Sequence, residues 1–241
     1  MSPPTNSPPL TDPYHMANPA LHLPKASTIL RKTLRRKRLQ LSKRQRFLAA
    51  YQAQRQLSHL CCRALRQKNR KVGLFVDAFG EMPTQPLIDW AYRHGHHVYL
   101  PVVRGVNQPL VFVRFIPRRL LSARLARHRL GMRQPATGAY INARELDVIV
   151  MPLVAVDAQG NRMGMGGGFY DRTLAKTKQK PLKIGWAYDF QQVTALDSKP
   201  WDVKLDAAVF PSQRLIFRRY TTKSSSKSPV KNPLNVVEPP L

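Results

Sequence analysis

The sequence predicts a three-layer α/β/α sandwich built around an open, mostly parallel β-sheet. Short apolar segments rich in Val, Ile and Leu alternate with longer segments whose apolar residues recur every three or four positions. Strands of a parallel sheet are buried on both faces and read as apolar runs, whereas the covering helices have one apolar side. Apolar residues make up 43% of the 241 residues, which is enough for the core of one ordinary domain.

Two helices rich in lysine and arginine are expected first, over residues 26–41 and 43–68. Ser42 lies between them and can cap the second helix. Two shorter helices are expected over residues 84–94 and about 169–176. One side of the first helix is formed by residues at helical spacing: Leu30, Leu34, Arg38 and Leu41.

Six strands are expected from short apolar runs that lie between the helical segments or next to one another. They cover residues 72–76, 97–103, 110–115, 146–151, 183–188 and 207–210. Helices between consecutive strands favour parallel pairing, because a parallel pair needs a long crossover connection.

The two ends of the chain differ in composition from the part between them. Residues 1–24 contain seven prolines, which are incompatible with a helix or a sheet ladder, so a disordered Pro-rich leader is expected. Residues 220–241 are rich in Ser, Lys and Pro and predict a disordered tail. The folded domain is therefore expected over residues 25–219. The leader also lacks a basic stretch followed by an apolar one, so no secretory signal is expected.

Composition excludes several classes of protein. No run of about 18 apolar residues occurs, so no membrane span is expected. The two cysteines, Cys61 and Cys62, are adjacent, which disfavours a disulfide between them, and two are too few for a four-cysteine zinc site. We therefore expect a reducing, cytoplasmic location.

The charge of the chain is strongly positive and uneven. Lys and Arg number 40 and Asp and Glu 13, which gives a net charge of +27. No acidic residue occurs between Asp12 and Asp77, and residues 25–71 hold 16 lysines and arginines. Such a surface attracts anions: nucleic acid, nucleotide phosphates, polyglutamate-like substrates or anionic lipid. The alternative is a solvated helix face with no partner.

A glycine-rich segment, residues 157–172, follows an expected strand and precedes an expected helix. Ligands of open α/β sheets bind at this position, beyond the carboxyl ends of the strands. Arg162 offers a guanidinium group to an anion, and Asp171 offers the hard oxygen that magnesium prefers. Four glycines allow the backbone to approach a phosphate closely: Gly164, Gly166, Gly167 and Gly168.

This segment matches neither of two common phosphate-binding patterns. It lacks the GxxxxGK[ST] spacing, and Phe169 stands where GxGxxG requires its third glycine. From the residues alone, the segment predicts an anion-binding loop without naming its ligand.

Residues 160–172 resemble the signature of the 5-formyltetrahydrofolate cyclo-ligase family, whose members are also called methenyltetrahydrofolate synthetases. The resemblance covers about residues 28–215, and its motifs are specific in combination. Further segments similar to the family are the basic stretch 31–38, residues 75–84 with Gly80-Glu81, the strand region 146–157, residues 185–191 and Trp201-Asp202.

The resemblance implies the NagB/RpiA/CoA-transferase-like form of the α/β/α fold, and a reaction that uses ATP and Mg²⁺. ATP phosphorylates the formyl oxygen of 5-formyltetrahydrofolate, and the 10-nitrogen of the folate then attacks the activated carbon. Phosphate leaves, giving 5,10-methenyltetrahydrofolate and ADP. Such chemistry depends on positioning and charge neutralisation more than on acid–base groups.

Site residues follow from the resemblance position by position. Catalytic roles fall on Arg162, Tyr170 and Asp171. The ATP-binding residues would be Arg31, Arg162, Met163, Gly164, Met165, Gly166, Gly167, Gly168, Phe169 and Tyr170. The folate-binding residues would be Val76, Glu81, Met165, Gly166, Gly167, Gly168 and Phe169, and the magnesium ligands Asp171 and Asp202.

Glu81 also has a physical reason to bind the folate, because a pterin ring presents a row of N–H donors that one carboxylate can accept. The alternative is an exposed turn glutamate after Gly80. The chain departs from the family's usual pattern at Ser27, Phe79, Pro83, Lys199-Pro200 and Phe210.

The alternative function is that of a basic nucleic-acid-binding protein, with a degenerate cyclo-ligase relative as one form of it. It rests on the +27 charge, but only Phe47 and Tyr51 could stack on bases within the basic stretch. We favour a monomeric enzyme that binds ATP and a folate and has non-specific affinity for RNA at its basic N-terminal helices.

Overall fold

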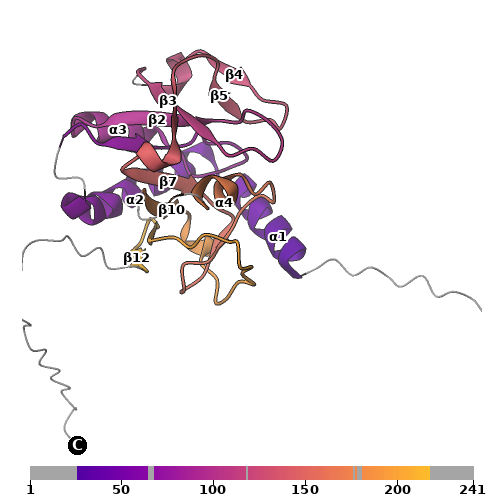
Figure 1. Ribbon diagram of the computed structural model, residues 1–241. Helices are drawn as coiled ribbons and strands as arrows, with labels where there is room; N and C mark the ends of the chain where they lie inside the picture. Colours follow the sequence, from indigo (N-terminus) through magenta and orange to yellow (C-terminus); the bar gives the residue numbers. More distant parts are fainter. Residues whose placement is uncertain (1–25, 65–67, 118, 176, 178–180, 218–241) are drawn as a thin grey trace, which may run out of the picture.

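The computed structural model in Figure 1 describes residues 26–64, 68–117, 119–175, 177 and 181–217. The expected leader, residues 1–24, and the expected tail, residues 220–241, lie outside these ranges, so both boundaries stay predictions. Within the described part of the chain, no helix is both long and apolar enough to cross a membrane.

The helices begin within one residue of the expected positions. The described residues form α1 (Ala26–Gln40), α2 (Lys43–Ala64), α3 (Gln85–Arg93) and α4 (Phe169–Leu174), with short 3₁₀ helices η1 (Leu120–Ser122), η2 (Ala143–Glu145) and η3 (Asp189–Gln191). Ser42 caps α2 as expected: its hydroxyl accepts a bond from the Gln45 N–H at 3.2 Å, and the Gln45 side chain accepts the Ser42 N–H at 2.8 Å.

An eight-stranded sheet forms the middle of the molecule, in the order β12-β11-β10-β7-β1-β2-β3-β6. Its strands are β1 (Lys71–Gly73), β2 (His97–Val102), β3 (Val111–Phe115), β6 (Tyr140–Asn142), β7 (Val148–Pro152), β10 (Leu182–Trp186), β11 (Ala207–Val209) and β12 (Arg214–Ile216). Two small hairpins pair β4 (Leu125–Arg127) with β5 (Arg133–Pro135) and β8 (Ala155–Val156) with β9 (Arg162–Met163).

The five central strands, β11-β10-β7-β1-β2, run parallel, and the outer strands β12, β3 and β6 are antiparallel to their neighbours. The six expected strands all occur, and the predicted fold of helices on both sides of a mostly parallel sheet is confirmed. Sequence analysis missed β4, β5, β6, β9 and β12. These strands have two or three residues each and are half-exposed or exposed, so they lack the apolar run that marks a buried strand. The short strand β8 is buried and continues the apolar stretch of the expected strand 146–151.

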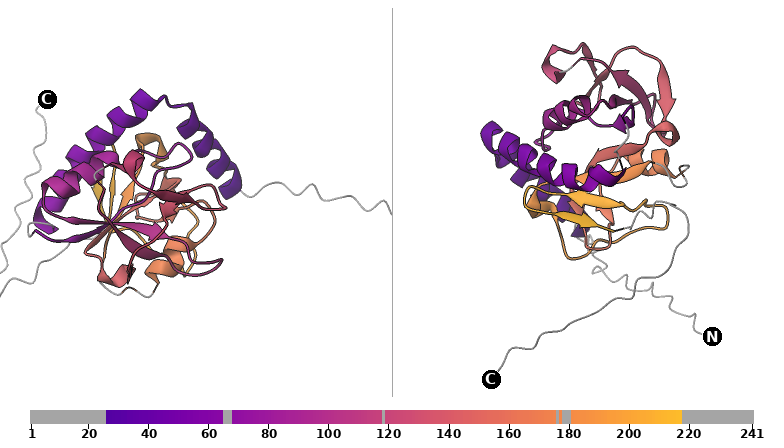
Figure 2. Two further views of the ribbon diagram at one scale, coloured as in Figure 1. Left: turned by 90° about the horizontal axis from the view of Figure 1, so that it is seen from above. Right: turned by 90° about the vertical axis from the view of Figure 1, so that its left-hand side faces the viewer.

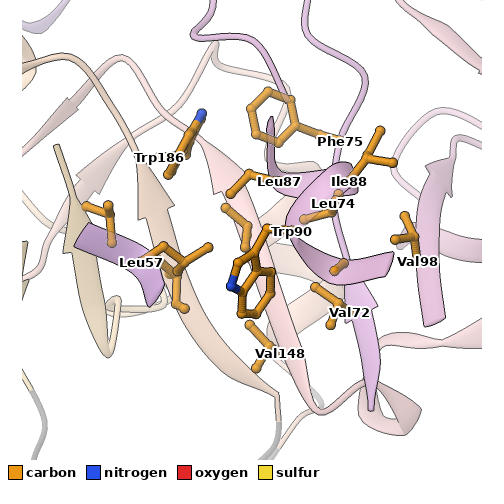
Figure 3. Packing of buried hydrophobic residues seen from close by; sticks show 14 of the residues in the cluster. Leu57, Val72, Leu74, Phe75, Leu87, Ile88, Trp90, Val98, Val148 and Trp186 are labelled. Atoms are coloured by element: carbon orange, nitrogen blue, oxygen red, sulfur yellow. The ribbon is translucent and has the colours of Figure 1, made fainter. Parts of the chain in front are cut away.

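Two hydrophobic clusters lie on the two faces of the sheet. One joins α2 and α3 to the sheet and contains Leu57, Trp90, Val72 and Val148, which are buried side by side (Figure 3). The other contains Phe112, Ile149, Met151, Leu174 and Phe210 and lies under α4. Figure 2 shows α1 and α2 as two long helices that meet at an angle along one side of the body. Burial of each large side chain contributes about 1.5–3 kcal/mol to folding.

The first strand is shorter than expected, and the difference creates space for a site. Residues 72–76 were expected to form one strand, but β1 ends at Gly73. The Leu74 N–H still donates to the Tyr99 carbonyl at 2.8 Å, after which Phe75 and Val76 leave the sheet and line a cavity.

Candidate functional site

A cavity of about 1100 Å³ opens at the carboxyl ends of the parallel strands. Phe75 and Val76 follow β1, Val103 follows β2, and Leu153 follows β7. Ligands of open α/β folds bind in this position. Its other walls come from the start of α1, the glycine-rich loop, the β4–β5 hairpin and residues 196–202.

Every site residue predicted from the sequence lines this one cavity. They are Arg31, Val76, Glu81, Arg162, Met163, Gly164, Met165, Gly166, Gly167, Gly168, Phe169, Tyr170, Asp171 and Asp202. They come from α1, from the segment after β1, from β9, the loop after it and the start of α4, and from the segment before β11. The fold therefore brings together residues that are up to 171 positions apart, from Arg31 to Asp202.

The glycine-rich loop, residues 164–168, joins β9 to α4. Gly166 has φ +98° and Gly168 has φ +63°, both in the left-handed region that favours glycine. A Cβ atom at Gly166 would meet no other atom within 4 Å, so the backbone there borders open space. A Cβ at Gly167 would lie 2.9 Å from the Phe169 ring. The loop thus offers bare backbone to the cavity.

Arginines from two helices bind this loop. Arg31 of α1 donates from Nε to the Gly164 carbonyl at 3.0 Å. Arg172 of α4 donates to the Gly167 carbonyl at 2.5 Å, and its guanidinium lies over the Phe169 ring. A third arginine, Arg162 of β9, has its guanidinium 6.0 Å from the ring centroid of Tyr170, which follows the loop.

A close ion pair lies in the wall of the cavity. Arg162 donates to Asp171 Oδ1 at 2.5 Å, and its side chain is only 4% exposed. The Val203 N–H donates to the same carboxylate oxygen at 3.3 Å. Tyr170, next to Asp171, is partly buried, and desolvation raises the pKa of its phenol far above the ordinary value, so the phenol stays neutral.

Glu81 lines the same cavity from a tight loop. Asp77 Oδ1 accepts both the N–H and the hydroxyl of Thr84, at 3.1 and 2.9 Å, which closes the loop. Within it, the Ala78 N–H donates to Glu81 Oε2 at 3.0 Å. Arg38 of α1 lies 3.9 Å from Glu81 Oε1. Burial raises the pKa of the Glu81 carboxyl to about 7, while the Arg38 charge opposes that rise.

Magnesium fits this site only together with phosphate oxygens. Asp171 and Asp202 line the same cavity, and Asp202 Oδ2 accepts the Lys199 N–H at 2.8 Å. No group of three or more His, Cys, Asp or Glu side chains that could hold a metal occurs among the described residues. Magnesium commonly takes one or two carboxylates plus substrate phosphates. The donor set therefore suits an ion bound with a triphosphate.

Several lining residues were missed by the sequence analysis. Arg133 and Gln134 belong to β5, and Arg35 lies one turn after Arg31 on α1. Arg35 repeats the helical spacing of Arg31 and could have been found from it. Arg133 and Gln134 gave no signal, because the β4–β5 hairpin lacks an apolar pattern.

The departures from the family pattern fall in different places. Ser27, Phe79 and Lys199 line the cavity, whereas Phe210 is fully buried in the hydrophobic cluster under α4. Lys199 places its ammonium 5.2 Å above the ring of Trp201, which also lines the cavity and is 65% exposed. The first three thus bear on ligand binding, and Phe210 bears on packing.

Comparisons with known proteins agree with the geometry. A sequence model of the 5-formyltetrahydrofolate cyclo-ligase family matches residues 24–211. The 5-formyltetrahydrofolate cyclo-ligase of Escherichia coli K12 is 40% identical over 146 residues, which are 59% of this chain and 78% of that protein. The protein of the same name from Haemophilus influenzae Rd is 34% identical over 163 residues, 66% of this chain and 85% of that protein.

The fold is also similar to a solved structure. The NMR structure of Aquifex aeolicus 5,10-methenyltetrahydrofolate synthetase superposes with a TM-score of 0.66 at 29% identity, and the match covers 83% of this chain and 96% of that chain. Sequence match, fold and cavity lining lead to one conclusion: this chain belongs to the 5-formyltetrahydrofolate cyclo-ligase family.

Proposed function

We infer that the protein converts 5-formyltetrahydrofolate and ATP into 5,10-methenyltetrahydrofolate, ADP and phosphate. The observation that carries this inference is that one cavity is lined both by the carboxylate of Glu81 and by the glycine-rich loop with the nearly buried Arg162 beside it. The formyl oxygen attacks the γ-phosphorus, and the bond from that phosphorus to ADP breaks. The 10-nitrogen then bonds to the formyl carbon and loses its proton, and the carbon–oxygen bond to phosphate breaks.

We propose that the loop and its arginines bind the triphosphate. Arg162 is nearly buried, so its charge acts with little screening by water. Arg31 and Arg35 add two further cations at the side formed by α1. Charge stabilisation of this kind is the main requirement of phosphoryl transfer. Asp171 and Asp202 would hold Mg²⁺, which when bound neutralises charge on the phosphates.

We assign Glu81 to the pterin ring. Its Oε2 accepts the Ala78 N–H and lies on a closed loop, so the carboxylate has a fixed position at the cavity wall. Met165 and Phe169 of the glycine-rich loop, with Val76 opposite, supply the apolar surface for a flat ring.

The test is an assay of purified protein with 5-formyltetrahydrofolate, with and without ATP and Mg²⁺. We expect the absorbance of the methenyl product to rise only when ATP is present. Omission or chelation of Mg²⁺ should suppress the rise. Absence of product with all three components present would refute the inference.

A second property is proposed for the outer face of α2: non-specific RNA affinity. Arg44, Tyr51 and Arg55 are exposed at helical spacing, and Phe47 is exposed one turn before Tyr51. Cations with interleaved aromatic rings suit single-stranded RNA. Affinity should fall steeply with salt, and Arg44→Gln with Arg55→Gln should flatten the slope by about one unit. Sequence-selective or salt-insensitive binding would contradict the proposal.

We also propose that the protein acts as a monomer in the cytoplasm. The fourteen site residues predicted from the sequence all lie in one chain and line one cavity, which supports this proposal. Sedimentation at assay concentrations checks the monomer, and a dimer that alone is active would overturn it. Cell fractionation checks the location.

A further inference from the structure

Arg38 is a buried charge that the site assignment leaves without a role. It lies near the end of α1, on the side of that helix that carries Leu34, and its side chain is 1% exposed. Burial lowers the pKa of its guanidinium, so the position is unfavourable for a cation. Its Nε finds no hydrogen-bond partner among the residues that the structure describes. Burial of a charge is costly unless other groups compensate it, so the contacts of the guanidinium determine whether this position is tolerated.

The guanidinium contacts three separate walls of the cavity. It donates to the Leu153 carbonyl beyond β7 at 3.3 Å. It lies 3.8 Å from the sulfur of Met165 in the glycine-rich loop, and 3.9 Å from Glu81 Oε1. Leu153, Met165 and Glu81 all line the cavity, whereas Arg38 lies behind them. One side chain thus links the wall assigned to the folate with the loop assigned to ATP.

The backbone of the Glu81 loop fits closely against α1 at this point. Gly80 has φ +75°, and a Cβ atom there would lie 3.0 Å from the backbone carbonyl of Arg38. Any side chain at Gly80 would therefore push the loop away from the helix. The Tyr188 hydroxyl donates to the Gly80 carbonyl at 3.3 Å. The distance between Arg38 and Glu81 is thus set by packing on both sides.

We propose that Arg38 is a positioning residue for folate binding, which orients the Glu81 carboxylate and holds it in register with Met165 of the glycine-rich loop. The proposal rests on the assignment of Glu81 to the pterin ring. At 3.9 Å the guanidinium is beyond hydrogen-bond length from Oε1, so that oxygen keeps its capacity to accept pterin N–H groups. Arg38 supplies charge without occupying the acceptor.

The groups that face Glu81 explain why such a cation is needed. Burial raises the pKa of Glu81 to about 7, and Asp77 on the same loop adds to the rise, whereas the Arg38 charge and the Ala78 N–H oppose it. Tyr170 of α4 and Tyr188 beyond β10 also face the carboxylate and stay neutral because burial raises their pKa values. Without Arg38 the pKa of Glu81 would rise further, and the protonated carboxyl would present a donor to the donors of the pterin.

The experiment compares Arg38→Met, Arg38→Lys, Glu81→Gln and the Arg38→Met/Glu81→Gln double variant of the full chain. We expect Arg38→Met to raise the KM for 5-formyltetrahydrofolate about tenfold or more, with the KM for ATP changed less than about twofold. The acid limb of the folate kcat/KM profile should move up by about one pH unit or more. Arg38→Lys keeps the positive charge, so its acid limb should stay close to that of the parent.

The double variant separates positioning from a merely structural role. If Arg38 acts through Glu81, the double variant should have the same folate KM as Glu81→Gln alone, because the second loss removes nothing further. Arg36→Met is the matched control, because Arg36 is an exposed cation on the same helix and does not line the cavity. The folate KM of this variant should equal that of the parent. Additive effects in the double variant would overturn the proposal.

Folding and function can be distinguished by a direct titration. Carboxyl carbon NMR of the parent and of Arg38→Lys gives the pKa of Glu81 without turnover, and Arg38→Met should raise it. If Arg38→Met does not fold, the double variant is used instead, because it has no unpaired carboxylate. Its folate KM is compared with that of Glu81→Gln, and a higher KM in the double variant refutes the proposal. A parent without turnover defeats the proposed function. An unchanged Glu81 pKa in Arg38→Met defeats this inference.

Discussion

Two carboxylates that line the cavity each lie near a buried arginine, but at different distances. Asp171 and Arg162 are 2.5 Å apart, whereas Glu81 and Arg38 are 3.9 Å apart. The first pair is a charge-assisted hydrogen bond, and Arg162 Nε has no hydrogen-bond partner among the described residues. The second leaves Glu81 Oε1 beyond hydrogen-bond length from the guanidinium. The Asp171 pair is therefore the more rigid one, and the Glu81 pair keeps an acceptor available for a ligand.

This difference predicts opposite effects on stability. Loss of Asp171 would leave the Arg162 guanidinium buried without a counter-charge, which is strongly unfavourable. Loss of the Glu81 charge would also take the acidic neighbour away from Arg38, but that neighbour lies 3.9 Å away, beyond hydrogen-bond length. The same loss removes a carboxylate whose pKa burial raises to about 7 even with Arg38 present, so above pH 7 the net effect should be stabilising. Activity should fall in both cases, so stability and activity together distinguish the two pairs.

The largest effect is expected from Asp171→Asn. The amide keeps the size of the side chain but lacks the charge that pairs with Arg162 and that Mg²⁺ prefers. We expect kcat to fall on the order of a hundredfold or more, with partial recovery at high Mg²⁺. Because Arg162 is 4% exposed, unfolding free energy should also fall by about 3 kcal/mol. Steady-state kinetics and thermal denaturation measure the two losses.

A double variant gives the control for this interpretation. Arg162→Met with Asp171→Asn removes both charges, so stability should return most of the way to that of the parent while activity stays low. Equal stability of Asp171→Asn and the parent would show that the pair contributes no rigidity, and the contrast with Glu81 would then fail.

A smaller loss is expected when the glycine-rich loop is altered. A side chain at Gly167 would lie 2.9 Å from the Phe169 ring, so Gly167→Val must displace a residue that lines the cavity. We expect the KM for ATP to rise about tenfold, because the ligand loses close contact with backbone. Gly164→Ala is the matched comparison: its Cβ would have Arg162 as nearest neighbour at 3.9 Å, so the rise should be much smaller. Equal effects of both changes would contradict the loop geometry.

The central fold was accessible from the sequence because its signal is local. Each of the six expected strands is an apolar run, and Ser42 with Gln45 forms the cap that its position predicts. The edges were not accessible. Strand β12 (Arg214–Ile216) is short and half-exposed. It forms by pairing with β11, and the three residues of β12 carry no sequence pattern that predicts this pairing.

The site was predictable where a motif or the family resemblance marked it, and unpredictable where only packing defines it. The glycine-rich loop and Glu81 stood out through residue type and similarity. Arg133 reaches the cavity only because β5 pairs with β4, so its sequence neighbours gave no sign of it. Helical spacing places Arg38 on the side of α1 that carries Leu34, but the degree of its burial, 1% exposure, depends on packing against distant segments.

A change confined to folate binding is expected from Glu81→Gln, which also has the most informative pH dependence. Replacing one acceptor oxygen by a donor should raise the folate KM about tenfold and leave the KM for ATP nearly unchanged. The folded-state pKa of Glu81, about 7, lies above the ordinary value of 4.5. Between these values the unfolded chain has released the proton while the folded chain keeps it, so stability falls as pH rises through this window.

Glutamine removes this pH-dependent cost, since it behaves as a permanently uncharged carboxyl that can still accept the Ala78 N–H. At pH 8 the variant should be more stable than the parent by about 3 kcal/mol, a rise in thermal midpoint of about 5 °C or more. At pH 4 the difference should vanish, because Glu81 is then protonated in both states of the parent. Thermal denaturation across this range measures it. A thermal midpoint lowered at pH 8 would mean that the Glu81 carboxylate stabilises the fold through Arg38, and that both carboxylate–arginine pairs contribute to stability.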